Sequence, residues 1–117
     1  MTGRVTRLRN RLRRAERRLA AYRRCDTDLA SVLTEICADE DLKSRDTSTV
    51  SELIEAVEDY LDRLIEPRSP LLEWVTDVGI DIAAAVAVDI YLGRGHRLEA
   101  RVDNLRRRLV AAQARVV

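Results

Sequence analysis

The chain has 117 residues, with 21 Lys and Arg against 20 Asp and Glu, three Tyr, one Trp and no Phe. This length suits one domain, and the dominance of good helix formers excludes a β-rich fold and predicts an all-α protein. Cys25 and Cys37 form no metal-binding or redox pair, and arginines stand where a signal peptide has its apolar core. We therefore expect reduced thiols in a cytoplasmic protein, or in a virion-associated one if it is phage-encoded.

The N-terminal segment has the heptad pattern of a coiled coil. Apolar residues recur there at alternating intervals of three and four, and the same frame continues through Leu29, Leu33 and Ile36. The pattern predicts one helix over about residues 3–38, with Asp26 as a polar interruption. The apolar seam of its first part consists of Val5, Leu8, Leu12, Ala15, Leu19 and Tyr22.

A second helix is predicted over residues 49–66, after a polar connection at 39–47 that holds a turn of helix around Asp41. Thr49 and Glu52 have the spacing of a capping box. Pro67 ends the helix, because proline disfavours helical backbone at the residue before it. Apolar residues line one face, and the opposite face carries the carboxylates of Glu52, Glu55, Glu58, Asp59, Asp62 and Glu66.

Residues 71–92 form the most apolar stretch, which predicts a central, buried helix over residues 70–92. Ser69 and Pro70 are typical of a helix start, and Gly93 of a helix end. Carboxylates inside the stretch would each cost roughly 2.5–3.5 kcal/mol near the centre of a bilayer, so we expect no membrane span. Helical spacing predicts that three of them, Glu73, Asp77 and Asp81, form one acidic stripe.

Asp89 faces away from this stripe, toward apolar neighbours, and is a candidate buried charge. A lone buried carboxylate is costly, so the sequence predicts an arginine partner from a terminal helix or from a neighbouring subunit. The alternative is that Asp89 reaches water at the end of the helix.

After a turn at residues 93–96, a last helix is predicted over residues 96–116. It carries a second heptad seam, made of Leu98, Val102, Leu105, Leu109, Ala112 and Val116. Four helices thus make one domain, in which two coiled-coil-like arms, residues 1–24 and 94–117, flank a central pair packed as a hairpin in residues 25–93.

Charge is distributed unevenly along the chain. Residues 1–24 hold ten Arg and one Glu (+9), residues 25–93 hold 17 acids and four bases (−13), and residues 94–117 hold seven Arg and two acids (+5). Because arginines flank both seams, packing two such helices together, in a self-pair or against each other, is expected to bring like charges together. We therefore expect a non-enzymatic assembly or adaptor protein that self-associates or binds a protein partner through its Arg-rich heptad helices and its acidic middle. The acidic face is expected to meet the arginine helices of the same chain or of a neighbouring copy. Each seam also favours self-association, because it leaves an apolar stripe exposed unless another helix covers it.

Nucleic acid is the alternative partner, because arginine clusters bind phosphate. The chain has no interleaved aromatic residues, helix-turn-helix pattern or zinc pattern, so such binding would be independent of sequence and sensitive to salt. We expect no metal and no cofactor. The candidate anion-binding residues are Arg7, Arg11, Arg14, Arg18, Arg101 and Arg108.

A further alternative comes from paired carboxylates. Glu52-x-x-Glu55, followed by Glu73 and Asp77, resembles the all-α MazG-like nucleotide pyrophosphohydrolases, in which ExxE and ExxD clusters on two helices hold Mg²⁺. The resemblance covers residues 52–81, and the second pair here is spaced by four where the family has three. It implies magnesium-dependent hydrolysis of a nucleoside triphosphate, whereas a capping residue and a solvated face account for the same carboxylates without catalysis.

Overall fold

The computed structural model describes residues 2–43, 48–64 and 69–115, which form helices and their connections with no strand among them. The all-α prediction is confirmed, but seven helices replace the four expected. They are α1 (Thr2–Arg23), α2 (Thr27–Ala38), α3 (Glu40–Lys43), α4 (Val50–Asp62), α5 (Pro70–Val78), α6 (Ile80–Tyr91) and α7 (Arg97–Ala114).

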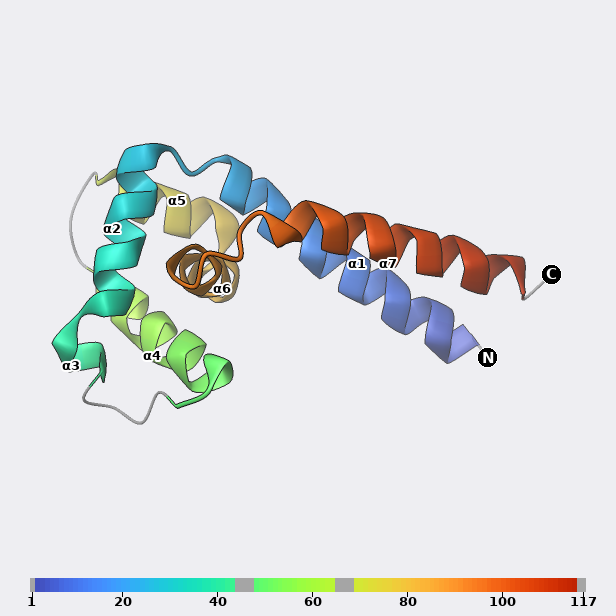
Figure 1. Cartoon of the computed structure of the whole chain (residues 1–117), viewed down its shortest axis with the longest axis horizontal. Coiled ribbons are helices and arrows are strands. Elements are labelled where there is room, and N and C mark those ends of the chain that lie inside the picture. Colours follow the sequence, from blue (N-terminus) through green and yellow to red (C-terminus); the bar gives the residue numbers. More distant parts are fainter. Residues whose placement is uncertain (1, 44–47, 65–68, 116–117) are drawn as a thin grey trace.

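The molecule has two parts, which we call the body and the arm (Figure 1). The body consists of α2 to α6, and the arm is the pair α1 and α7, which projects from it with the start of α1 and the end of α7 at its far tip. The whole measures 52 × 30 × 23 Å. No helix among the described residues is long and apolar enough to cross a membrane.

Helix α6 is the centre of the body, as expected for the most apolar stretch. Ala83, Ala84, Val86, Ala87 and Val88 are fully buried, and α1, α2, α4 and α5 all pack against this helix. The run of alanines leaves little side-chain bulk, so neighbouring backbones can approach closely.

The single helix expected over residues 3–38 is wrong, because the chain leaves the helical path at residues 24–26. The carboxylate of Asp26 accepts a hydrogen bond from the amide of Leu29 at 2.7 Å and caps the N-terminus of α2. An aspartate at this position thus starts a new helix instead of interrupting a seam. This break lets the chain turn from the arm into the body.

The single helix over residues 70–92 is also wrong. Its start is as predicted, with the Ser69 hydroxyl accepting from the amide of Leu72 at 3.0 Å. Gly79 then divides the stretch into α5 and α6, and its φ of +92° is a conformation that residues with a Cβ rarely adopt. The apolar run therefore supplies two short helices, and Gly79 is the residue that separates them.

The second predicted helix is found as α4, which ends at Asp62, before the expected boundary at residue 66. Residues 65–67 lie outside the described residues. Thr49 caps the helix by accepting from the amide of Glu52 at 3.1 Å. The Glu52 carboxylate accepts a hydrogen bond from the amide of Ser48 at 3.2 Å. In a capping box the donor would be the amide of Thr49, the next residue. The turn expected around Asp41 is present as α3.

The two predicted seams meet each other within one chain. Helices α1 and α7 run antiparallel in the arm, and their seam residues form one apolar cluster (Figure 1). Val116, the last predicted seam residue, lies outside the described residues. The cluster comprises Leu8, Ala15, Leu19, Leu98, Val102, Leu105 and Ala112, with Val5, Leu12, Tyr22 and Leu109 packed at its edges.

The expectation that these two helices repel each other is therefore wrong. The antiparallel arrangement brings the few arm carboxylates opposite arginines, with Arg23 3.7 Å from Glu99 and Arg106 3.3 Å from Glu16. The tight turn at Gly93–His96 makes this pairing possible. A Cβ built on Gly95 would lie 2.2 Å from a ring carbon of Tyr22, so only glycine fits beside that ring without a shift.

Candidate functional site

The arm is strongly basic, and its charge lies apart from the acidic body. Helices α1 and α7 together carry 14 arginines against three acids, which gives the arm a charge of +11. The compensating acids lie on the body, which the arm leaves as it projects (Figure 1). Intrachain neutralisation, one of the expectations from the sequence, is therefore confined to a few contacts.

One face of the arm holds the ion pairs between its two helices. Successive helical residues are about 100° apart, so Glu16 and Arg23 of α1 lie to one side of the α1 seam. Glu99 and Arg106 of α7 lie at the same offset from the α7 seam. Because the two helices are antiparallel, equal offsets from their seams place side chains on the same face, as the two cross-helix ion pairs require.

The opposite face of the arm carries two stripes of arginine. On α1, Arg7, Arg11 and Arg14 are spaced by four and three, and the same helical geometry places them on the other side of the seam from Glu16. On α7, Arg101 and Arg108 lie at a matching offset. We call this surface the arginine face, and its α7 stripe is extended by Arg97 and Arg115.

The arginine face is not neutralised by the described parts of the chain. Arg7, Arg11, Arg14, Arg101 and Arg108 are all exposed, and none has a carboxylate partner among the described residues. The Nε of Arg7 donates to the carbonyl oxygen of Gly3 at 3.2 Å, which holds this side chain along its own helix. These five residues are five of the six candidate anion-binding arginines.

The sixth, Arg18, has a different role, so its place among the anion-binding residues is a correction. Its guanidinium contacts the carboxylate of Asp89, which is only 4% exposed. Arg94, in the turn before α7, contacts the other carboxylate oxygen at 3.4 Å. Asp89 is thus buried and held by an arginine from a terminal helix, because α1 packs against α6 at the base of the arm.

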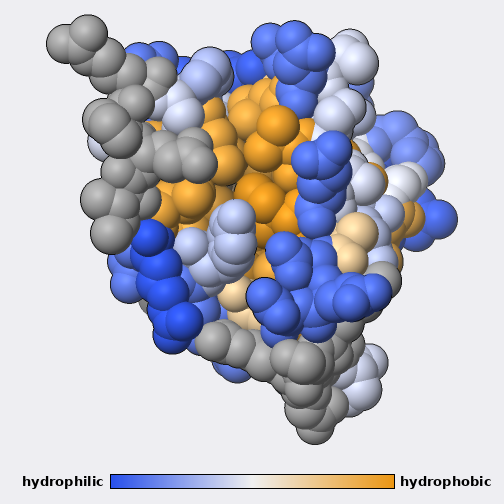
Figure 2. All heavy atoms as spheres, turned by 90° about the vertical axis from the view of Figure 1, so that its left-hand side faces the viewer, coloured by the Kyte–Doolittle hydropathy of each residue, from blue (hydrophilic) through white to orange (hydrophobic). Residues whose placement is uncertain are grey.

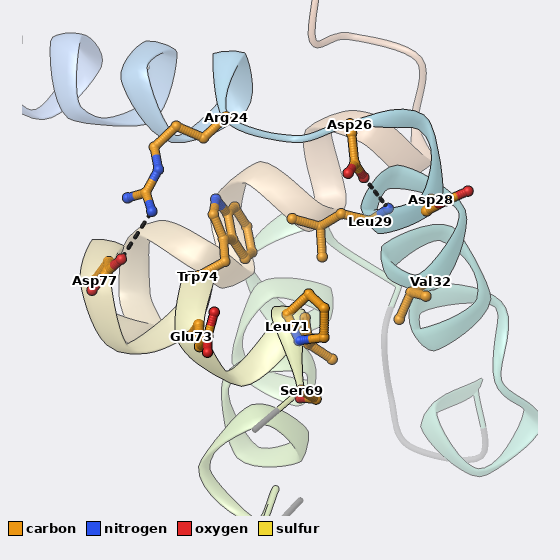
Figure 3. Close-up of a pocket in the computed structure, with 11 residues that line it drawn as sticks. Arg24, Asp26, Asp28, Leu29, Val32, Ser69, Leu71, Glu73, Trp74 and Asp77 are labelled. Atoms are coloured by element: carbon orange, nitrogen blue, oxygen red, sulfur yellow. Dashed lines mark hydrogen bonds and ion pairs between the residues drawn. The ribbon is translucent and has the colours of Figure 1, made fainter. Parts of the chain in front are cut away.

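The acidic stripe expected on one helix is divided by the break at Gly79. Asp77, on α5, accepts a hydrogen bond from Arg24 at 2.9 Å and lines a hollow of about 430 Å³ together with Glu73 (Figure 3). Asp81, on α6, instead faces α4. Burial and the neighbouring charges of Asp81, Glu55 and Asp59 raise the pKa of Glu58 on α4.

The remaining acidic residues lie along α4. Glu55, Asp59 and Asp62 are exposed there, while Glu52 is half-buried beside its capping contact. Glu58, from the same acidic face, is half-buried, and its pKa is raised first by this burial and then by the charges of Asp81, Glu55 and Asp59.

The carboxylates that resemble those of MazG-like enzymes do not converge. Glu52 and Glu55 lie on α4, Glu73 and Asp77 lie on α5, and both helices pack against α6. Asp77 is already engaged by Arg24. Within residues 2–43, 48–64 and 69–115 there is no group of three or more His, Cys, Asp or Glu residues that could hold a metal ion.

Neither cysteine is poised as a nucleophile. Burial raises the pKa of Cys37 to about 11, and burial with the nearby Asp26 raises that of Cys25 to about 11. Both thiols therefore stay protonated at neutral pH, and a protonated thiol is a weak nucleophile and metal ligand.

Comparisons of the chain with protein-family models, with curated proteins and with solved structures found no match.

Proposed function

We propose that the protein is a non-enzymatic nucleic-acid-binding protein whose arm binds the phosphate backbone without sequence preference. The observation that supports this most is the arginine face, where two stripes from α1 and α7 share one surface and have no carboxylate partners among the described residues. A polyanion would supply the negative charge that the chain itself does not bring to this face.

Arginine suits this role because its planar guanidinium binds phosphate oxygens through two hydrogen bonds and stays charged at any physiological pH. The arm carries no aromatic residue on that face for bases to stack on. Its one aromatic residue, Tyr22, packs between the seam and Gly95. Contacts limited to phosphate fix a position on the duplex but carry no sequence information.

Self-association through the heptad seams, one form of the assembly expected from the sequence, is less favoured by the arrangement of the arm. That expectation required an apolar stripe left uncovered on each terminal helix. The seams instead cover each other in the arm, where Leu8, Val102 and Leu105 are buried. A role as an adaptor remains compatible with the proposal, because the body is free to meet a second partner while the arm lies on nucleic acid.

A charge-matched pair of variants tests the proposal. Arg7→Gln/Arg11→Gln/Arg14→Gln removes three charges from the arginine face, and the control Arg9→Gln/Arg13→Gln/Arg17→Gln removes three from the outer side of the same helix. Binding of a labelled duplex of arbitrary sequence is followed by fluorescence anisotropy. We expect the first variant to lose roughly tenfold or more in affinity, and the control to lose less than about threefold.

Equal losses in both variants would mean that net charge alone drives binding and that the face has no special role. Absence of any duplex binding by the unaltered protein at low salt would contradict the proposal itself. Two duplexes of unrelated sequence should bind alike, because no base contact is proposed.

A further inference from the structure

The end of the body that faces away from the arm carries an apolar surface (Figure 2). Apolar side chains occupy the centre of this face, and hydrophilic ones surround it. Two hollows lie between α2, α4 and α5 and share Val32 and Leu71. Their apolar lining consists of Leu29, Val32, Ile36, Leu64, Leu71, Pro70 and Trp74.

Carboxylates surround this apolar surface, which we call the acidic groove. Among the described residues, the two hollows are lined by six acids and one base, Arg24, which is already bound to Asp77. Figure 3 shows Leu29, Leu71 and Trp74 in the hollow between α2 and α5, with Glu73 and Asp77 close by. The six acids are Asp26, Asp28, Glu35, Asp39, Glu73 and Asp77.

The matching chemistry lies near the tip of the arm. Val110 of α7 is 65% exposed, the most exposed of the large hydrophobic side chains that the structure describes. Arg107, which is exposed, precedes it by one helical turn, so an aliphatic side chain stands beside a cation. Arg106, also one turn away, is already paired with Glu16 and Asp103. An exposed aliphatic side chain beside an arginine is chemically complementary to an apolar surface surrounded by carboxylates.

The two surfaces cannot meet within one molecule, because they lie at opposite ends of a structure 52 Å long. Pairing of two acidic grooves in a symmetric dimer would set six acids against six, and opposed like charges cost several kcal/mol. The charge pattern therefore favours a head-to-tail contact between copies.

We propose that the acidic groove binds the arm tip of a second copy of this chain, with Val110 seated over Val32 and Leu71 and Arg107 on the carboxylate rim. Such a contact uses different surfaces on the two partners, so it extends into an open chain unless its rotation closes a ring. Val110 lies on the far side of α7 from Arg101 and Arg108, which leaves the arginine face uncovered. The inference is therefore independent of nucleic-acid binding.

Three matched variants test the contact. Val32→Asp places a charge in the groove, Val110→Asp places one on the arm tip, and Val50→Asp is the control. Val50 is 40% exposed, against 39% for Val32, and lies on α4 outside both hollows. Molar mass is measured by light scattering over a range of concentrations, at low and high salt, without nucleic acid.

The unaltered protein and Val50→Asp should show a mass that rises with concentration and falls with salt, while Val32→Asp and Val110→Asp should each stay monomeric. An equimolar mixture of these last two variants decides the geometry. One retains an intact arm tip and the other an intact groove, so the mixture should form a 1:1 dimer and nothing larger.

A mixture that stays monomeric, or an unaltered protein that is monomeric under every condition, would overturn the head-to-tail contact. Loss of assembly in Val50→Asp, or its persistence in Val110→Asp, would do the same. Duplex binding by Val32→Asp should be unchanged, which separates a failure of this contact from a failure of the arginine face.

Discussion

Arg18 of α1 donates from Nη2 to the Oδ2 atom of Asp89 on α6, at a distance of 2.5 Å. The carboxylate is buried, whereas the Arg18 side chain is 21% exposed, although its Nε is buried and has no hydrogen-bond partner among the described residues. With Arg94 on the second oxygen, this contact joins the start of the turn, the arm and the body at one point. It therefore ties the base of the arm to the body.

Asp89→Ala should lower the free energy of unfolding by about 3 kcal/mol. This is near the lower end of the cost of breaking a buried ion pair, because Arg18 and Arg94 can both turn toward solvent. Arg18→Ala should cost less, since Arg94 still contacts the carboxylate. Urea denaturation measures both. Asp103→Ala, which removes an exposed carboxylate on α7, is the control and should match the unaltered protein. An Asp89→Ala curve superimposed on that of the control would contradict a stabilising role for this pair.

Gly79→Ala should destabilise the protein by about 1–3 kcal/mol, because a side chain at a φ of +92° is strained. The added Cβ would also lie 3.1 Å from Oδ1 of Asp81. Gly3→Ala serves as the control, since Gly3 lies in α1 with no neighbour within 4 Å of a built Cβ, and it should be neutral or slightly stabilising. If the melting temperature of Gly79→Ala equals or exceeds that of Gly3→Ala, the break between α5 and α6 does not require glycine.

Glu58→Gln should stabilise the protein more at neutral pH than at mildly acidic pH. The pKa of Glu58 is raised above its ordinary value of 4.5, so the folded state holds this proton more tightly than the unfolded state. The contribution of Glu58 to stability therefore falls as pH rises from 4.5 through the raised pKa. The gain from Glu58→Gln, measured by urea denaturation, should grow across this range. Glu35→Gln, on α2, is the control. If the gain in unfolding free energy from Glu58→Gln does not change with pH, the raised pKa of Glu58 is contradicted.

Local signals in the sequence predicted the helical segments and several of their ends. Ser69 and Thr49 cap their helices because each stands directly before an apolar periodic stretch and can bond an amide three residues on. The environment of Asp89 was also foreseeable, since a carboxylate on an apolar helix face needs a cation. Gly79 is the one residue in this stretch that indicates a break between two helices, but the apolar residues on both sides of it favour one continuous helix.

Pairing between distant segments was not readable in the same way. The contact of Arg106 with Glu16 joins residues 90 positions apart, and only the antiparallel order of α1 and α7 brings them together. The two arginine stripes could each be identified from their spacing, but their presence on one face depends on that order. The acidic groove likewise arises only where α2, α4 and α5 meet.

The salt dependence of duplex binding tests the central claim most directly. For phosphate contacts, the logarithm of the binding constant falls linearly with the logarithm of salt concentration, by about 0.9 per phosphate neutralised, between about 50 and 200 mM. Replacing Arg7, Arg11 and Arg14 with Gln should lower this slope by about 3, and adding Arg101→Gln and Arg108→Gln should lower it by about 2 more, because the α1 and α7 stripes bind as one face. A slope that is unchanged by the α7 substitutions would contradict a shared arginine face.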